Sequence, residues 1–463
     1  MLQTLKNAWK TKEIRSKILF TLFILLLYRI GTVIPVPFVD AHSFESSFSG
    51  TILDYMNILS GGSLGTATLF ALGVSPYINA SIIIQLLSVV FPKLGELAKN
   101  DKKKMGFITR IVTVLLALVT AIGYYFLIED ALSPAASGSD SWFYAIVIIA
   151  CYCAGASIIM WLAERINERG IGNGISLILF ANIVSSMPSM FYNLVGVVID
   201  TFNYEAPVGY AIASISFALG LIAIIIAMTI FVIWVTGSER RIPVQYAKRV
   251  VGRKMYGGQS SHLPIKLNMT GVMPVIFASS IVSLVPTILA LCKITGEGDT
   301  GWDTFARVIG NDGVIYPVVF LILIIAFAYF YTQITFDPIE VANNLKKQGG
   351  AVPGIRQGRP TADYIRKILN KITLAGALFL AIVAVLPIVA GPHVIEHILY
   401  GIKLGAYADV TETAMSYARA NAESLAGVFT FGGTTLLIVV GVVIETFREL
   451  EAQLTMRNYK GFL

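Results

Sequence analysis

The sequence contains few charged residues and few cysteines. Asp, Glu, Lys and Arg make up only 14% of its 463 residues, whereas an ordinary globular protein has about 25%. A chain with 56% hydrophobic residues and so little charge lacks the polar surface that a soluble protein needs. We therefore expect it to reside in a lipid bilayer. The three cysteines, Cys151, Cys153 and Cys292, lie in apolar runs without metal-ligand spacing, so they predict no disulfide framework.

The apolar runs also lack carboxylates near their centres. Asp and Glu occur only at the edges of these runs, for example at Glu129, Asp337 and Glu445. Transporters driven by protons or sodium usually need ionisable groups inside the membrane to couple the ion to the substrate. The sequence therefore disfavours a secondary transporter of small solutes, although that class remains the main alternative.

Enzyme motifs are scarce, and the two partial matches are weak. The segment GIGNG at 170–174 follows an apolar run rather than a strand and lacks the Walker lysine, so it predicts a flexible turn. The segment HVIEH at 393–397 matches the H-x-x-E-H pattern of inverted zinc peptidases. A membrane metalloprotease is thus a third hypothesis, but no third ligand is evident. We predict no catalytic residue, metal or cofactor.

The apolar runs have the length of membrane spans. A hydrocarbon core of about 30 Å requires about 20 apolar residues in a helix. Nine runs meet this requirement, and a tenth, at 69–91, is interrupted by Gly73 and Pro76. Ten crossings place both termini on the same side of the membrane. The nine uninterrupted runs are 18–36, 107–128, 142–162, 174–195, 210–236, 271–292, 314–333, 372–390 and 427–445.

The basic residues are distributed very unevenly between the two sides. The tails and alternate loops hold 30 of the 35 Lys and Arg residues, the opposite loops hold 4, and Arg29 lies within the first run. Because cytoplasmic loops are enriched in Lys and Arg, this predicts that both termini are cytoplasmic. The two longest basic loops, 237–268 and 335–371, contain many Gly and Pro residues and predict turn-rich protrusions that contact anionic lipid or a large partner.

A short amphipathic segment precedes the interrupted run. Ile52, Tyr55, Met56 and Leu59 recur on one helical face, and glycines at 61 and 62 end the segment. A helix of nine residues covers about 14 Å, less than half of the hydrocarbon core. It cannot span the membrane, and broken backbone at membrane depth requires surrounding protein or a water-filled cavity. The segment therefore suggests a pore with a movable obstruction.

Arg29 is the one charge inside an apolar run, near its outer end. The simpler interpretation is that its side chain extends to the membrane interface. The alternative is a structural pairing near the mouth of a cavity.

Several segments, in order along nearly the whole chain, resemble the protein-translocation channels of the SecY family. They are RIGTVIPVP (29–37), FALGVSPYINASIIIQ (70–85), RGIGNGIS (169–176), RRIPVQYAKR (240–249), NMTGVMPVIFASS (268–280), VPGIR (352–356) and FGGTTLLIVV (431–440).

The resemblance implies an all-α polytopic membrane protein of ten transmembrane helices, arranged as two pseudo-symmetric five-helix halves, 1–205 and 206–463, around a central pore. It also implies a constriction made by an apolar ring, a plug helix at 52–60 that seals the resting pore, and a lateral gate between the span containing Ile82 and the span starting near Gly271. The implied apolar ring consists of Ile78, Ile82, Leu179, Ile183, Ile276 and Ile438.

The same resemblance implies a location in the bacterial cell membrane and a set of partners. These are SecE and SecG subunits, the SecA motor ATPase, the ribosome, and preproteins with signal sequences, besides the lipid. The residues expected to dock the motor or the ribosome are Arg240, Arg241, Lys248, Arg249 and Arg356. After Arg356 the family commonly has Pro-Gly, whereas this chain has Gln-Gly, so the tip of that loop can differ in shape.

Overall fold

The computed structural model describes residues 2–39, 60–128, 141–203, 208–246, 249–251, 254–256, 260–291, 305, 315–390 and 433–456. Each of the ten apolar runs contains a helix in these residues. The helices are α2 (Lys12–Gly31), α5 (Ser75–Val90), α7 (Lys102–Leu127), α8 (Ser141–Arg169), α9 (Gly174–Asn203), α10 (Val208–Gly237), α11 (Met273–Leu291), α13 (Ile315–Thr335), α15 (Arg359–Ala390) and a final helix over 433–456.

Several helices extend beyond the apolar runs or stop short of them. By length and hydropathy alone, five helices of the described residues could cross a membrane, and α5 joined to the short helix α6 (Pro92–Asn100) would be a sixth, bent by 118°. The helix α15 begins 13 residues before its apolar run, while α2 ends at Gly31 and leaves 32–36 outside the helix. The sequence therefore located the helices better than it located their ends.

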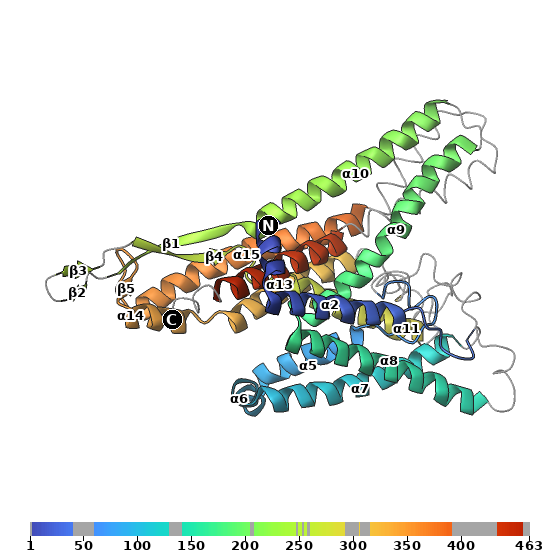
Figure 1. The fold of residues 1–463 in the computed structure, drawn as a ribbon, viewed down its shortest axis with the longest axis horizontal. Coiled ribbons are helices and arrows are strands. Elements are labelled where there is room, and N and C mark those ends of the chain that lie inside the picture. The colour runs from blue at the N-terminus through green and yellow to red at the C-terminus, as the bar shows by residue number, and fades with distance from the viewer. Residues whose placement is uncertain are drawn as a thin grey trace.

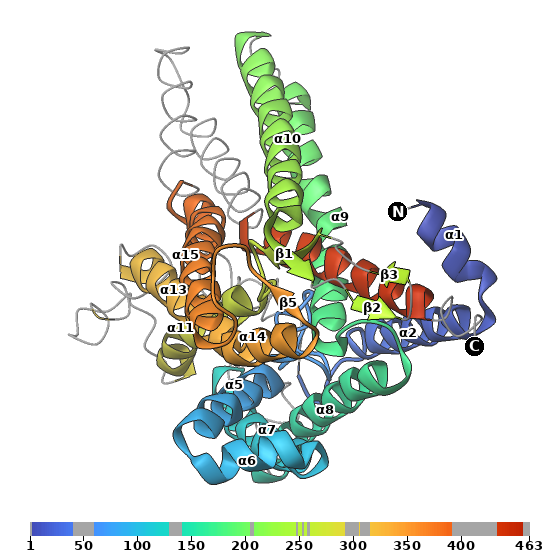
Figure 2. The same ribbon diagram turned by 90° about the vertical axis from the view of Figure 1, so that its left-hand side faces the viewer.

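The helices fall into groups that Figure 1 separates by colour. The helices α5 to α8 lie together at the bottom of the view, whereas α13, α15 and the final helix lie above them. The helix α11 touches α5 and α7 as well as α13 and α15, so it lies where these groups meet. The helices α9 and α10 pack on each other and extend away from the rest, as Figure 2 shows most clearly.

A small β-sheet stands beyond the helix ends, where the sequence led us to expect only turns. Strands β1 (Glu239–Tyr246), β4 (Ser260–Lys266) and β5 (Gly350–Ala351) form an antiparallel sheet in the order β4-β1-β5. At its tip, β2 (Arg249–Val251) pairs with β3 (Lys254–Tyr256). We call the strands β1 to β5, helix α14 (Pro338–Lys347) and the turn at 352–358 together the sheet protrusion.

The sheet protrusion has a hydrophobic core of its own. Ile242 and Val244 on β1 face inward and pack with Ile265 of β4 and with Ile365 of α15. Because β1 pairs with both β4 and β5, residues near 245 lie beside residues near 350, about a hundred positions later in the chain. The two basic loops predicted from the sequence are therefore one structural unit (Figure 1).

The turn between α8 and α9 is tightly packed rather than a flexible connection. Gly172 adopts a positive φ of 85°, and the amide of Gly174 donates a hydrogen bond of 2.7 Å to Oδ1 of Asn167. The amide of Ile171 donates to the Thr21 hydroxyl of α2 at 3.1 Å. A Cβ atom at Gly174 would lie 2.1 Å from the carbonyl oxygen of Ala163, so α8 and α9 can approach this closely only at a glycine.

Candidate pore and docking face

A cavity of about 100 Å³ lies where α5, α9, α11 and the final helix converge. Its lining includes Ile78 of α5, Leu179 of α9, Ile276 of α11 and Ile438 of the final helix. All four side chains are at least 94% buried and belong to the main hydrophobic core. Four helices that are far apart in the sequence therefore each contribute one apolar side chain to the same cavity.

The structure brings four of the six expected ring residues to the cavity and places the other two nearby. Ile82 and Ile183 follow Ile78 and Leu179 by one helical turn on α5 and α9. Both are buried in the same core, but they do not line the cavity. On α5 and α9, the residues expected in the ring therefore occupy two successive helical turns of the same core.

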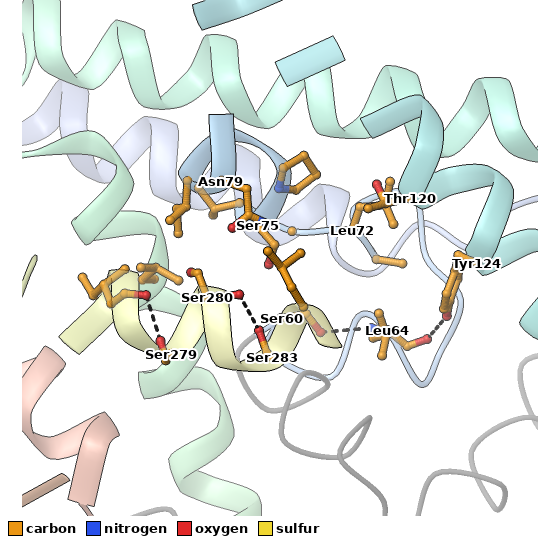
Figure 3. Close-up of a pocket in the computed structure, with 18 of the residues that line it drawn as sticks. Ser60, Leu64, Leu72, Ser75, Asn79, Thr120, Tyr124, Ser279, Ser280 and Ser283 are labelled. Carbon is orange, nitrogen blue, oxygen red and sulfur yellow. Dashed lines mark hydrogen bonds between the residues drawn. The ribbon is translucent and has the colours of Figure 1, made fainter. Parts of the chain in front are cut away.

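Part of the cavity lining is polar, and its serines were not predicted from the sequence. Ser279, Ser280 and Ser283 of α11 line it together with Asn79 of α5 (Figure 3). The Ser279 hydroxyl donates to the carbonyl of Ile276 at 2.9 Å, and the Ser283 hydroxyl donates to that of Ser280 at 3.0 Å. Serines spaced by three and four positions in an apolar helix were the available signal.

The expected plug residues Ile52, Tyr55, Met56 and Leu59 lie outside the described residues. The next residue, Ser60, is described, lines the cavity, and accepts a hydrogen bond from the amide of Leu64 at 3.1 Å (Figure 3). The chain that leads from the predicted plug to α5 therefore runs along the wall of this cavity.

The non-helical stretch 60–74 is held between helices by close contacts. The ring of Phe70 stacks on Tyr28 of α2 with centroids 5.5 Å apart, and it lies so close to Gly31 that a Cβ atom there would clash. A Cβ atom at Gly155 of α8 would lie 1.9 Å from the carbonyl oxygen of Leu69. Irregular backbone at this depth is thus surrounded by protein, as a bilayer requires.

Arg29 does not extend freely to the membrane interface. Its Nη1 atom is buried and has no hydrogen-bond partner among the described residues. A Cβ atom at Gly61 would lie 3.2 Å from Nη1 of Arg29. Gly61 directly follows Ser60, which lines the cavity. The guanidinium of Arg29 therefore lies close to the chain beside the cavity, but the structural pairing of the alternative interpretation stays a prediction.

The described members of the expected docking set lie on the sheet protrusion. Arg240 and Arg241 are exposed on β1, Arg249 lies in β2, and Arg356 is exposed in the turn after β5. Lys248 lies outside the described residues. The side chain of Arg241 pairs with Glu239 at 2.7 Å, so it is the one member of the set with an ion pair among the described residues.

Positive charge is also concentrated where the sheet protrusion meets the final helix. Burial, together with the nearby positive charge of Arg448, lowers the pKa of Lys266 at the end of β4, and Glu239 partly offsets this effect. The guanidinium of Arg448 also donates to the carbonyl of Thr236 at 3.3 Å. Lys266 and Arg448 therefore lie close together at this junction.

No group of three metal-ligating side chains occurs in the described part of the chain. The H-x-x-E-H segment at 393–397 lies outside it.

These features define a class: a polytopic helical membrane protein with a cavity of mixed apolar and polar lining where four helices meet, and with a protrusion that exposes basic residues. Residues 68–447 match the SecY family model. The chain is 39% identical to the protein translocase subunit SecY of Streptomyces galbus and 38% identical to that of Mycobacterium bovis, over the full length of each protein. This chain belongs to the SecY family.

Solved structures show the same fold at lower sequence identity. The structure of a protein-conducting channel matches 94% of this chain with a TM-score of 0.61 at 18% identity, and 92% of that channel is covered. Sec61 in a canine ribosome–channel complex from the endoplasmic reticulum matches with a TM-score of 0.57 at 17% identity, with 94% of this chain and 92% of Sec61 covered. The fold is therefore that of the ten-helix SecY and Sec61 membrane channels, a family of protein-conducting channels rather than of enzymes.

Proposed function

We propose that this chain is the channel subunit of a protein translocase, a passive gated pore that passes unfolded secretory polypeptides and releases transmembrane segments sideways into lipid. One observation carries the proposal: four helices each place one aliphatic side chain, Ile78, Leu179, Ile276 or Ile438, around a single cavity.

An apolar ring suits a channel for polypeptides because it must let every kind of side chain pass without binding any of them. Aliphatic side chains offer no hydrogen bond or charge to a passing peptide. A narrow apolar constriction also fills reluctantly with water when it is empty, which limits the leak of ions. A small-solute transporter needs side chains that bind its substrate specifically, and such side chains would also bind a passing polypeptide. We therefore favour the channel over the secondary transporter.

Release into lipid requires a seam through which a segment can leave the pore. The contact of α11 with α5 and α7 supports the lateral gate that the family resemblance implies, a seam between the span containing Ile82 and the span starting near Gly271. A segment in an open seam partitions according to its composition. Each Leu or Phe near its centre favours lipid by a few tenths of a kcal/mol, and a central charge opposes lipid by about 3 kcal/mol.

We place the protein in the bacterial cell membrane with both termini and the sheet protrusion in the cytoplasm. The asymmetry of Lys and Arg supports this orientation. Two exposed tryptophans on α8, Trp142 and Trp161, are separated by a rise of about 28 Å, which suits an aromatic side chain at each interface of the hydrocarbon core. Arg165 lies over the Trp161 ring at 5.3 Å, on the side assigned to the cytoplasm.

The sheet protrusion is the proposed docking site for the ribosome or the SecA motor, and SecE and SecG are the proposed companion subunits. Arg240, Arg241, Lys248, Arg249 and Arg356 would contact the acidic surface of the docked partner. We infer no catalytic residue and no cofactor, so energy for transport comes from the docked partner or from a gradient.

Site-specific photo-crosslinking tests the pore. A photoreactive residue at Ile82 or Ile276 is expected to label a preprotein arrested during transport, whereas the same residue at Trp142, which is 68% exposed on α8, is not. Labelling at Trp142 without labelling at Ile82 and Ile276 would contradict a path through the apolar ring.

The plug assignment is tested separately by deleting residues 52–60. If this segment seals the resting pore, the deletion raises the ion leak of the reconstituted channel. An unchanged leak, with normal amounts of assembled protein, would contradict the plug assignment and leave the pore assignment standing.

A further inference from the structure

A hydrogen bond links two helices that belong to different predicted halves of the chain. The hydroxyl of Tyr331 on α13 donates to Oε1 of Gln85 on α5, across 246 positions of sequence. The Nε2 of Gln85 donates to the Ser81 hydroxyl at 3.0 Å. Because this second bond engages the amide nitrogen, the amide oxygen is turned toward Tyr331.

The Tyr331 ring is held in place by aromatic neighbours. Its centroid lies 5.0 Å from that of Phe277 on α11 and 5.7 Å from that of Phe330. Phe277 is 98% buried and directly follows the cavity residue Ile276. The hydroxyl is therefore positioned by packing within α11 and α13, independently of Gln85.

The bond lies close to the apolar ring on both of its sides. Gln85 follows Ile82 by three positions on α5, and Tyr331 contacts the neighbour of Ile276 on α11. If α5 moved away from α11 and α13, both the ring and this hydrogen bond would open together. The bond is partly buried by protein.

We propose that Tyr331 and Gln85 form a latch that holds α5 against the neighbouring pair α11 and α13, and so keeps the seam between α5 and α11 closed in the resting channel. This inference rests on the proposed function, since it gives that seam a regulating contact. A hydrogen bond suits the role because it is directional and is lost after a small separation, whereas apolar contacts along the same seam weaken gradually. A polypeptide entering the seam can replace the bond, since its backbone offers both a donor and an acceptor to the separated side chains.

The substitution Tyr331→Phe tests the latch because it removes the hydroxyl and leaves the ring against Phe277. The expected result is a resting ion conductance, measured in reconstituted proteoliposomes, that rises about 3-fold and at most about 20-fold, the range that side-chain hydrogen bonds between membrane helices support. Tyr329→Phe is the matched control, because the Tyr329 hydroxyl donates to the carbonyl of Asn370 at 3.2 Å within the later half of the chain. It should leave the conductance unchanged.

A double-mutant cycle with Gln85→Met distinguishes loss of the hydrogen bond from a general destabilisation of the helix packing. If the two side chains act through their mutual bond, Tyr331→Phe adds little to the conductance of Gln85→Met. Additive increases, or equal increases in Tyr331→Phe and Tyr329→Phe, would overturn the latch. The melting temperature of each purified variant shows whether it is folded, and the two single variants provide independent tests.

Transport of a preprotein with an intact signal sequence is measured in the same proteoliposomes, supplied with the proposed companion subunits, the SecA motor and ATP. Failure of the wild-type channel to transport it would contradict the proposed function, while the conductance would still decide whether the latch exists. Normal wild-type transport together with an unchanged conductance in both Tyr331→Phe and Gln85→Met would overturn the latch alone.

Discussion

The proposed functional side chains are buried in the apolar ring and exposed on the sheet protrusion. The ring residues are buried aliphatic side chains, drawn from four helices, that look like ordinary core residues one at a time. The sheet protrusion exposes Arg240, Arg241 and Arg356 over a small core that includes Ile242 and Val244. In the ring, the residues that pack the fold also form the proposed site. In the protrusion, one set of residues packs the core and another set is proposed to contact the partner.

This difference predicts how the two regions respond to mutation. A change in the ring should alter stability and gating together, because the same side chain serves both. A change in the protrusion should alter either its stability or its partner binding, depending on whether the residue is buried or exposed.

The largest effect is expected from Ile276→Ala in the ring. Truncating a buried isoleucine costs roughly 2–5 kcal/mol of stability, and here it also widens the constriction, so the resting ion conductance should rise. The matched variant is Ile242→Ala in the sheet core, where the side chain is similarly buried. It should lose comparable stability without any change in conductance.

Thermal unfolding in detergent and conductance in proteoliposomes check this pair of variants. Equal conductance in the two variants would show that the ring is not a separate functional region.

The next effect is expected at the junction of the two regions. A Cβ atom at Gly376 of α15 would lie 2.4 Å from the carbonyl oxygen of Leu267, which follows β4. Gly376→Ala should therefore push the end of the protrusion away from α15, at a cost of about 1–3 kcal/mol. Gly106→Ala on α7, where a Cβ atom would meet nothing within 4 Å, is the control. Equal melting temperatures for the two variants would argue against this close approach.

A smaller effect is expected from reversing exposed charges on the protrusion. The double change Arg240→Glu and Arg241→Glu should leave the melting temperature nearly unchanged, because both side chains are exposed. It should slow the association of the ribosome or the motor, most clearly at low salt. Lys103→Glu, an exposed basic residue at the start of α7, is the control. Binding kinetics at two salt concentrations distinguish the variants, and equal slowing in both would assign the effect to overall charge.

The smallest effect is expected from Glu239→Gln, which breaks the ion pair with Arg241. The side chains of the pair are 32% and 66% exposed, and an exposed pair contributes about 0.2–1 kcal/mol. The melting temperature should hardly change, and partner binding should be unaffected or slightly stronger because Arg241 is released. Weaker binding would indicate that the pair positions Arg241 for its partner.

The sequence predicted the helices well because membrane helices depend on a local property. An apolar run of about 20 residues must form a helix in lipid, since every backbone group then finds its partner within the same segment. The ends were less certain, because α15 begins at Arg359, well outside its apolar run, where packing rather than hydropathy decides.

The sheet protrusion was missed for a physical reason. Pro243 and Pro264 lie within its strands β1 and β4, and proline argues against a strand because it cannot donate to the ladder. Only Ile242 and Val244 alternate inward on β1, too short a pattern to recognise. The pairing of β1 with β5 then joins segments about a hundred residues apart, which no local signal reports.

The positions of the ring residues came from family resemblance, and the serine face of the cavity was overlooked altogether. A buried isoleucine has the same sequence context in a ring as in any helix core. Polar spacing on α11 was visible, but its meaning depends on which helix faces it.

The sequence by itself determined that this protein lies in a membrane, where its helices run and how its charge is divided, because hydropathy and charge act residue by residue. Only the tertiary structure decided that Ile78, Leu179, Ile276 and Ile438 meet at one cavity, that two basic loops form one sheet protrusion, and that Tyr331 reaches Gln85. These are contacts between distant segments. They follow from how the helices pack, and packing depends on the whole set of side chains at once.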